Sequence, residues 1–292
     1  MRERSTDRRA LGIALALILA LMGGEVTAGI VASSLALLSD AAHLLTDAAA
    51  LALALVAARL ATRPAKGAMT FGLGRAEILS AQVNGLTLGL LAILVAIAAV
   101  MRLVHPPNVD AKLVLVVAAV GVVVNLLATR TLASSDRQSI NIEGAYKHIL
   151  TDLVGFAAAG VAALVILASG FQRADPIASL VVCAVMVHSA YGLLRSAGRV
   201  FMEAAPEGVD PGAIGRVLAE VPGVVEVHDL HVWEVTTGFS ALAAHVLVDS
   251  GADCHAIRRE LHRTLDEQFG LRHTTLQVDH RPRGGLLEIE SG

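Results

Sequence analysis

The stretch Leu35–Leu60 reads LALLSDAAHLLTDAAALALALVAARL, and its length and apolar character indicate a helix that crosses a lipid bilayer. Such a helix needs about 20 mostly apolar residues. Within the stretch, His43 and Asp47 are four residues apart and would lie on one helix face, one turn from each other. An ionisable group near the bilayer centre costs about 2.5–3.5 kcal/mol on insertion scales, so such groups are rare and usually functional.

The composition of the whole chain also indicates a helical membrane protein with some soluble mass. Apolar residues (AVILMFWYC) make up 55% of the 292 residues, charged residues make up 17%, and the mean hydropathy is +0.65. Soluble domains contain about 25% charged residues. The apolar content excludes a disordered chain, and two cysteines are too few for a disulfide scaffold. The net charge of −3 argues against a nucleic-acid partner.

Six apolar runs of span length predict an all-α, six-helix transmembrane domain over residues 10–203. The first run follows four arginines and is also compatible with a cleaved signal peptide, but its full span length and the five runs after it favour a membrane span. The runs are Ala10–Ala32, Leu35–Leu60, Ile78–Val100, Leu113–Leu132, Ile149–Ser169 and Ile177–Leu194.

The distribution of Lys and Arg predicts the orientation of the spans. Thirteen of these residues lie in the N-terminal tail, at or after the ends of the second and fourth runs, and directly after the sixth run, whereas three lie in the alternate loops. Loops rich in Lys and Arg stay on the cytoplasmic side. We therefore expect a multi-pass protein of the inner cell membrane, with the tail 1–9 and both termini in the cytoplasm.

The composition changes after Pro206, and residues 206–282 predict a small α+β cytoplasmic domain followed by a tail over 283–292. Helix caps, β-branched runs and a Thr-Thr-Gly turn predict the order α-β-β-α-β. The expected elements are a helix from Asp210-Pro211 to about Glu220, strands Val224–Val235 and Phe239–Val248, a helix over Asp253–Phe269 ended by Gly270, and a strand over His273–Asp279.

A second His-Asp pair repeats the spacing of the first. His43-Leu-Leu-Thr-Asp47 recurs as His148-Ile-Leu-Thr-Asp152 at the start of the fifth span. Two such helices side by side would offer two imidazole nitrogens and two carboxylate oxygens, which suits tetrahedral Zn²⁺. The alternative is that the pairs form hydrogen bonds between helices. Asp40 shares the face of His43, and we expect it to support the ligands or carry protons rather than bind the metal.

The remaining polar positions have simpler expected roles. Glu25, Asn84 and Asn125 lie within the spans and are expected to be packing contacts between helices. Seven of the eleven histidines lie in the cytoplasmic domain. Because alternate residues of a strand share a face, His228 and His231 are expected to point to opposite sides of the sheet.

In combination, these motifs resemble the cation diffusion facilitator family, in its zinc-exporting branch. The resemblance runs from about residue 10 to residue 280. It implies a homodimer, a metallochaperone-like cytoplasmic domain for metal binding and dimerisation, and exchange of metal for protons. It also implies transport ligands at His43, Asp47, His148 and Asp152. Members that also carry cadmium or iron often have Asp at the first of these, so His43 resembles the zinc-selective pattern. The matching segments are SDAAHLLTD (39–47), TFGLGRAEIL (70–79), Asn84, EGA (143–145), HILTD (148–152), Asp175-Pro176 and VHDLHVW (227–233).

The resemblance further implies metal sites in the cytoplasmic domain. Gln277 departs from the pattern, since some members have His there, and this puts a fully occupied two-metal site in doubt. Solvated surface histidines are the alternative reading. The implied ligands are His228, His245, His273 and Asp279, with a bridging or additional position at Cys254 and His255.

We therefore expect a dimeric Zn²⁺/H⁺ antiporter that exports zinc from the cytoplasm by alternating access, with Cd²⁺ and Co²⁺ as broader substrates. Its partners would be a second copy, Zn²⁺, protons and the bilayer, with zinc as both cargo and regulatory ion. Two other classes stay open. An intramembrane zinc enzyme would need an open coordination position, and the sequence has no His-Glu-x-x-His motif. A membrane zinc sensor would report zinc without moving it.

Overall fold

The structure consists of two compact units, and each is described by itself. It is a computed structural model that describes residues 22–133 and 140–281, although the side chains of residues 127–151 lie outside the description. One unit combines Met1–Leu53 with Val83–Leu194, and the other combines Ala54–Gln82 with Arg195–Gly292. The predicted tails 1–9 and 283–292, and most of the first predicted span, lie outside the described residues.

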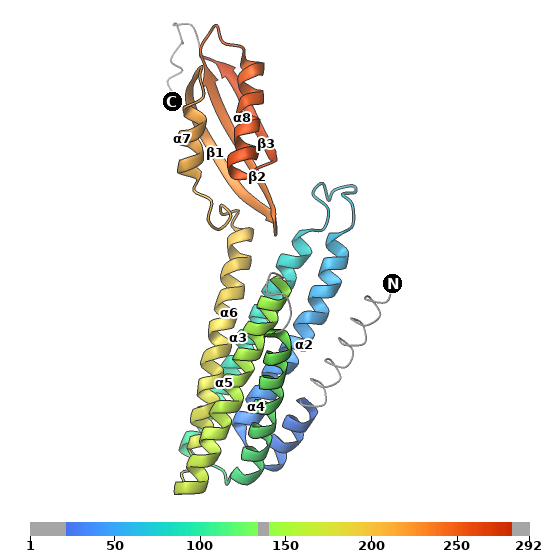
Figure 1. Cartoon of the computed structure of the whole chain (residues 1–292), viewed down its shortest axis with the longest axis vertical. Helices are drawn as coiled ribbons and strands as arrows, with labels where there is room; N and C mark the ends of the chain where they lie inside the picture. Colours follow the sequence, from blue (N-terminus) through green and yellow to red (C-terminus); the bar gives the residue numbers. More distant parts are fainter. Residues whose placement is uncertain (1–21, 134–139, 282–292) are drawn as a thin grey trace, which may run out of the picture. The chain divides into compact units, whose positions relative to one another are not determined.

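Five long helices in the described part of the chain carry most of the apolar sequence (Figure 1). By length and composition, α2, α3, α6 and the Asp152–Ser169 part of α5 can cross a membrane, whereas the described apolar part of α4, Ala111–Leu126, is shorter. Large apolar side chains such as Leu90, Ile93 and Ile97 are exposed, as lipid-facing residues are. The helices are α2 (Leu35–Ala61), α3 (Arg75–Val104), α4 (Ala111–Ala133), α5 (Ile140–Ser169) and α6 (Ala174–Phe201), and residues 22–31 are helical as well.

Small residues let the helices of the first unit pack closely. At Gly121 of α4, a Cβ atom would collide with the ring of Phe156 on α5, so this contact requires glycine. In lipid, close contacts of this kind drive helix association, since lipid tails are as apolar as the side chains. Alanines from the 22–31 helix, α2, α4, α5 and α6 share one buried cluster, formed by Ala28, Ala32, Ala36, Ala118, Ala159, Ala162, Ala163, Ala174 and Ala178.

The start of α2 is capped by an acid from another helix. Asp175, in the first turn of α6, is 1% exposed and accepts hydrogen bonds from the Leu35 backbone N–H at 2.7 Å and from the Ser34 hydroxyl. Arg102 of α3 lies 3.9 Å from the same carboxylate and donates to the Ser33 carbonyl oxygen at 2.6 Å. A carboxylate at a helix N-terminus satisfies free N–H groups and interacts favourably with the helix dipole. Asp175 therefore ties the ends of α2, α3 and α6 together.

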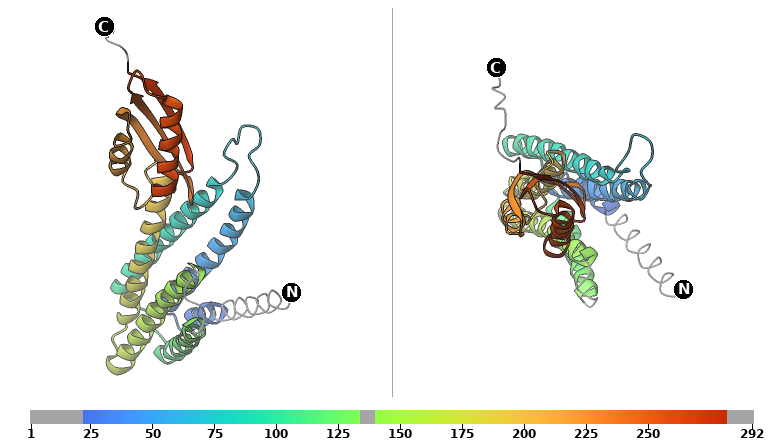
Figure 2. Two further views of the ribbon diagram at one scale, coloured as in Figure 1. Left: turned by 45° about the horizontal axis from the view of Figure 1, so that its top comes forward. Right: turned by 90° about the horizontal axis from the view of Figure 1, so that it is seen from above.

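The second unit contains a small sheet with the predicted α-β-β-α-β order (Figures 1 and 2). The sheet order is β1-β2-β3, with β1 antiparallel to β2 and β2 parallel to β3. Both helices cover one face, because side chains of α7 and α8 share a core with Leu242, Ala244 and Val246 of β2. The predicted fold class, a helical membrane domain followed by a small α+β domain, is confirmed. The elements are α7 (Pro211–Ala219), β1 (Val224–Thr236), β2 (Phe239–Val248), α8 (Cys254–Phe269) and β3 (His273–His280).

Side-chain caps and a glycine set the ends of α7 and α8, and the sequence predicts those at Asp210 and Gly270. The Asp210 side chain accepts a hydrogen bond from the Gly212 N–H. Asp253 accepts hydrogen bonds at the start of α8, the one from Ala256 foremost, and these hold the pKa of Asp253 below its ordinary value. Gly270 ends α8 with a left-handed φ of 67°, which glycine adopts without strain.

A bulge in β1 overturns one prediction. Asp229 has a φ of 48°, and the pairing shifts between His228, opposite His245, and His231, opposite Ala243. His245 and Ala243 share one face of β2, so their partners His228 and His231 share that face too. The prediction that these two histidines face opposite sides is therefore wrong, because strict alternation holds only for an unbroken strand.

Asp175→Ala should lower the free energy of unfolding by about 1–3 kcal/mol, because it leaves the first N–H of α2 without its acceptor and the Arg102 guanidinium without its ion-pair partner. Asp175→Asn keeps one acceptor oxygen and should lose less. Thermal unfolding of the purified chain in detergent, followed by the helical circular dichroism signal, measures both. Asp110→Ala, which removes an exposed cap of α4, is the control. Unfolding of Asp175→Ala at the wild-type temperature would contradict the capping role.

Candidate functional site

Helices α2 and α5 run in opposite directions and contact each other where Asp40 meets Gly155. The side chain of Asp40 on α2 packs directly on the α5 backbone at Gly155, where a Cβ atom would collide with it. The start of α2 at Leu35 contacts Asp175 at the start of α6, and α5 ends at Ser169, shortly before α6 begins. The start of α2 and the end of α5 therefore lie at the same end of the bundle.

This antiparallel register puts one predicted ligand from each helix at the same depth. His43 follows Asp40 by three residues along α2, and Asp152 precedes Gly155 by three residues along α5. Both therefore lie about 4.5 Å below the Asp40 contact, at 1.5 Å per residue. His43 is 4% exposed and Asp152 is 7% exposed, so both side chains are buried.

The second member of each pair follows one turn further along its helix. Asp47 lies four residues beyond His43, and its Oδ2 atom is 3.7 Å from His43 Nε2. The backbone of His148 lies four residues before Asp152 on α5, so it is level with Asp47. The side chain of His148 lies outside the described residues. The two helices thus carry the four predicted positions at two neighbouring levels of one interface.

The His43 side chain is unusual for a buried histidine. Neither ring nitrogen makes a hydrogen bond to any residue that the structure describes, whereas buried polar atoms normally have such partners. An imidazole in this state beside a carboxylate can bind a divalent cation or take up a proton. Hydrogen bonding between helices, the alternative role, would leave these nitrogens already bonded. Within the described residues, the His43 ring therefore does not serve as such a hydrogen-bonding group.

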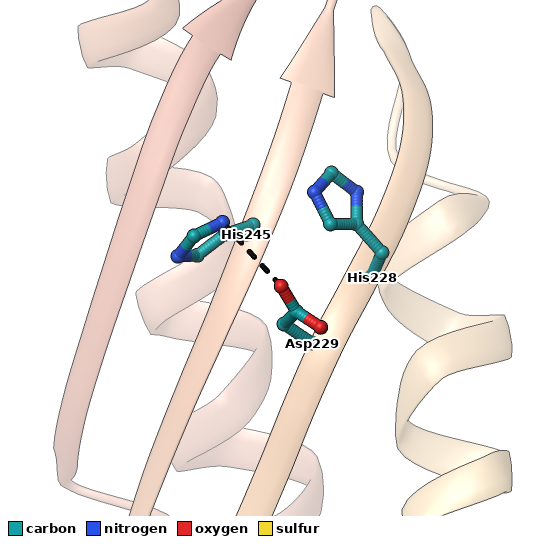
Figure 3. Close-up of side chains that lie close together, drawn as sticks. All are labelled: His228, Asp229 and His245. Atoms are coloured by element: carbon teal, nitrogen blue, oxygen red, sulfur yellow. Dashed lines mark ion pairs between the residues drawn. The ribbon is translucent and has the colours of Figure 1, made fainter. Parts of the chain in front are cut away.

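A second group of ligand side chains lies on the face of the sheet opposite the helices (Figure 3). His228 on β1 and His245 on β2 are directly paired, with ring centroids 5.4 Å apart. The Oδ2 atom of Asp229 lies 3.9 Å from Nδ1 of His245. One ligand atom from each residue lies within 4.8 Å of the other two. Zn²⁺ bonds of about 2.0–2.1 Å place tetrahedral ligands about 3.4 Å apart, so small side-chain rotations would close this set around an ion.

The two groups differ in how closely their ligand atoms approach. Within the described residues, His228, Asp229 and His245 are the one group of three whose ligand atoms all lie within 4.8 Å of one another. The ligand atoms of His43, Asp47 and Asp152 do not all lie this close together. His148, the fourth predicted ligand, has a side chain outside the described residues, so this comparison covers three of the four positions.

Asp229 is a candidate ligand that sequence analysis does not predict. In an unbroken strand its side chain would face away from that of His228, and the bulge is what brings the two together. Aspartate is one of the few residues that tolerates a positive φ. The available signal is an aspartate inside a β-rich run, since aspartate is depleted in strands.

Two of the other predicted cytoplasmic ligands lie on β3, outside the cluster of three. His273 is at the start of the strand, where its ring packs edge-on against Phe71 and Phe239, with centroids 5.8 Å and 5.3 Å away. Asp279 accepts a hydrogen bond from the Gln277 side-chain amide at 2.8 Å. The structure therefore gives His273 an aromatic environment and gives Asp279 a partner on its own strand.

The last two predicted positions lie at the start of α8, in the layer that covers the other face of the sheet. Cys254 is half-buried and packs against the core between α8 and the sheet. The backbone N–H of His255 donates to the Asp253 cap at 3.0 Å. The sheet therefore separates both residues from the face that carries His228.

Comparison with known families gives matches over both parts of the chain. Residues 11–202 match the family described as the cation efflux transmembrane domain. Residues 206–281 match the family described as the cytoplasmic domain of cation efflux proteins.

Curated relatives are similar over nearly the whole chain. The cation efflux system protein CzcD of Alcaligenes sp. (strain CT14) is 36% identical, over 94% of this chain and 88% of the relative. The cadmium, cobalt and zinc/H(+)-K(+) antiporter of Bacillus subtilis is 35% identical, over 95% and 90%. The zinc transporter ZitB of Escherichia coli is 35% identical, over 89% and 84%. A solved structure, the metal-bound C-terminal domain of the CzcD transporter from Cupriavidus metallidurans, is 32% identical with a TM-score of 0.23, over 24% of this chain and 97% of that one.

Asp229→Ala should weaken Zn²⁺ binding at the cytoplasmic cluster at least about tenfold, since it removes one of three ligands. Calorimetric titration of the full chain measures this, in an Asp152→Ala background that disables the membrane site. Asp249→Ala removes a carboxylate at the end of β2 and outside the cluster, and it should bind Zn²⁺ as the background does. Equal affinities for the two variants would exclude Asp229 as a ligand.

Proposed function

Because the chain belongs to the cation efflux family, we propose that it exports Zn²⁺ from the cytoplasm across the membrane in exchange for protons. The family match covers both the membrane helices and the cytoplasmic domain. The names of two relatives, a zinc transporter and an antiporter of cadmium, cobalt, zinc and protons, support the same activity here.

The observation that carries this proposal is the buried interface between α2 and α5. His43 and Asp152 lie at one depth, and Asp47 and the backbone of His148 lie one turn further. The His43 ring nitrogens have no hydrogen-bond partner within the described residues. Two imidazoles and two carboxylates at such an interface form a site that would hold Zn²⁺ as a transported substrate.

Zinc and protons compete for the same atoms of this site. A histidine or carboxylate must be deprotonated to bind a metal, so binding of Zn²⁺ releases protons. When Zn²⁺ leaves, the same nitrogen and oxygen atoms are free to take up protons. Exchange of one Zn²⁺ for one proton moves one net charge, worth about 2.3 kcal/mol per 100 mV, and exchange for two protons is electroneutral.

The position of the site between two helices fits alternating access. His43 and Asp47 lie on α2, whereas Asp152 and the backbone of His148 lie on α5. Rocking of the helices about a Zn²⁺ ion held between them would expose the ion first to one side of the membrane and then to the other. The Lys and Arg distribution supports termini in the cytoplasm, so Zn²⁺ enters the site from the cytoplasmic side.

The donor set favours zinc without excluding neighbouring metals. Imidazole nitrogen and carboxylate oxygen in a tetrahedral set suit Zn²⁺, and Co²⁺ and Cd²⁺ accept the same atoms. The antiporter of Bacillus subtilis carries cadmium and cobalt in its name. We therefore include Cd²⁺ and Co²⁺ as broader substrates of this chain.

The small sheet is proposed to bind regulatory Zn²⁺ and to pair with the sheet of a second copy. His228, Asp229 and His245 fit the ion by donor type and by spacing. Three ligands leave one tetrahedral position, which water or a residue of the second copy can fill. The match to the cytoplasmic domain of cation efflux proteins supports the homodimer.

The two alternative classes are weaker. The matched family consists of transporters and not of enzymes, which removes the intramembrane zinc enzyme. A zinc sensor would not need its intramembrane ligands for metal movement. Loss of flux on removal of Asp47 or Asp152 therefore separates a transporter from a sensor.

Asp47→Ala and Asp152→Ala should each reduce Zn²⁺ flux at least about 100-fold, because each removes a direct ligand. The measurement is Zn²⁺ uptake into proteoliposomes under an imposed pH gradient. Asp110→Asn, which changes an exposed carboxylate at the start of α4, should transport as the wild type does. Wild-type flux that ignores the pH gradient, or ligand variants that keep full flux, would refute the antiporter.

Zinc loading should shorten the distance between the cytoplasmic domains of a dimer. Spin or fluorescent labels on an introduced Glu267→Cys of the full chain, in a Cys254→Ser background, measure this distance with and without Zn²⁺. The His228→Ala and His245→Ala double variant should show no change. A wild-type distance that is the same with and without the ion would count against a regulatory role of the cluster.

A further inference from the structure

Glu25 is a carboxylate with no described partner in the interior of the membrane unit. Its exposure is 0%, and neither carboxylate oxygen makes a hydrogen bond within the described part of the chain. An ionised carboxylate in such a place is costly, so the group must carry a proton or face a cation. The expectation that Glu25 is only a packing contact does not account for two unpartnered oxygens.

The packing of the first helical hairpin sets the depth of Glu25. The helix that contains Glu25 turns back into α2 within a few residues, and Gly29 faces Leu38 so closely that a Cβ would lie 2.9 Å from the leucine side chain. Glu25 lies four residues before Gly29, and Ala42 lies four residues after Leu38, so each is about 6 Å further from the turn along its own helix. Glu25 is therefore at the depth of His43, the residue after Ala42.

Two other carboxylates, those of Asp40 and Asp152, disfavour a negative charge on Glu25. Asp40 on α2 is 2% exposed, and its Oδ2 atom has no hydrogen-bond partner among the described residues. Asp40 and Asp152 both repel a negative charge on Glu25, and they repel each other. Asp40 on α2 and Asp152 on α5 are thus the acids that act on Glu25, and His43 lies at the same depth on α2.

We propose that Glu25 and Asp40 form a proton-binding pair, separate from the four metal ligands, that takes up a proton exchanged for Zn²⁺. The proposal rests on the antiport function and names a proton carrier for it. Zn²⁺ prefers sites with nitrogen or sulfur ligands, whereas this pair offers only carboxylate oxygens in a dehydrated position. A proton is therefore the ligand that matches it.

The proposed step balances in charge. With the site empty of metal and open to the outside, a proton from the outer solution binds a carboxylate oxygen of the pair and forms an O–H bond. With the site open to the cytoplasm, the positive charge of arriving Zn²⁺ favours the ionised carboxylate, and the O–H bond breaks. The proton leaves to the cytoplasm, and the remaining negative charge balances part of the charge of the dication.

The test counts protons and zinc separately in the purified full chain. Protons released per Zn²⁺ bound are measured with a pH indicator in weak buffer, and Zn²⁺ flux is measured in proteoliposomes across a series of pH gradients. Glu25→Gln should bind the same number of Zn²⁺ ions, release about one fewer proton per ion, and respond less to the gradient. Glu25→Asp keeps a carboxylate and should keep the release. Asn84→Ala, a polar residue within α3, should behave as the wild type does.

The outcomes separate this proposal from the antiport function itself. Gradient-driven wild-type flux together with full proton release by Glu25→Gln would overturn the role of Glu25 and leave the antiporter intact. Loss of Zn²⁺ binding by both Glu25→Gln and Glu25→Asp would also overturn it, because Glu25 would then serve the metal site. Wild-type flux that ignores the gradient would instead refute antiport. If Glu25→Gln does not fold, Asp40→Asn makes the same test, and an unchanged proton count there would overturn the pair.

Discussion

The cost of holding ionisable side chains away from water governs the architecture of the membrane unit. His43, Asp40, Asp152 and Glu25 are all buried at neighbouring depths, in a bundle whose other contacts are largely between apolar side chains. A soluble protein would relieve such groups with water, but a bundle that faces lipid offers little water for this purpose. Within the described residues, the unpartnered polar atoms of Glu25, Asp40 and His43 therefore favour uptake of metal or protons.

The remaining packing makes this burial possible. Alanine and glycine contacts bring the helices close, as where Phe156 lies on the backbone at Gly121 and Asp40 lies on the backbone at Gly155. These contacts fix the antiparallel register of α2 and α5, and the register matches the depths of the two His-Asp pairs. The small residues carry no ligand atoms, but they let the helices pack closely enough to place the ligands of the His-Asp pairs.

Local signals predicted the fold well, whereas tertiary contacts decided the sites. Span length, the Asp210 cap and the Gly270 stop act within a few residues, so the order of elements could be predicted from the sequence. Asp229 joins a ligand cluster through a bulge, and His273 contacts aromatic rings from distant segments; neither depends on local pattern. The depth of Glu25 follows only from how its helix packs against α2, and the periodicity of the sequence does not specify this packing.

Because hydrogen bonds to Asp175 hold the start of α2, this end of the helix is the point about which the helix can tilt. Asp47 lies twelve residues from Leu35, or about 18 Å along the helix axis. A tilt of about 10° around the Asp175 contact would swing Asp47 sideways by about 3 Å, more than the length of a zinc–oxygen bond of about 2.0–2.2 Å. A small tilt of α2 that leaves its capped end in place is therefore enough to make or break metal coordination by Asp47.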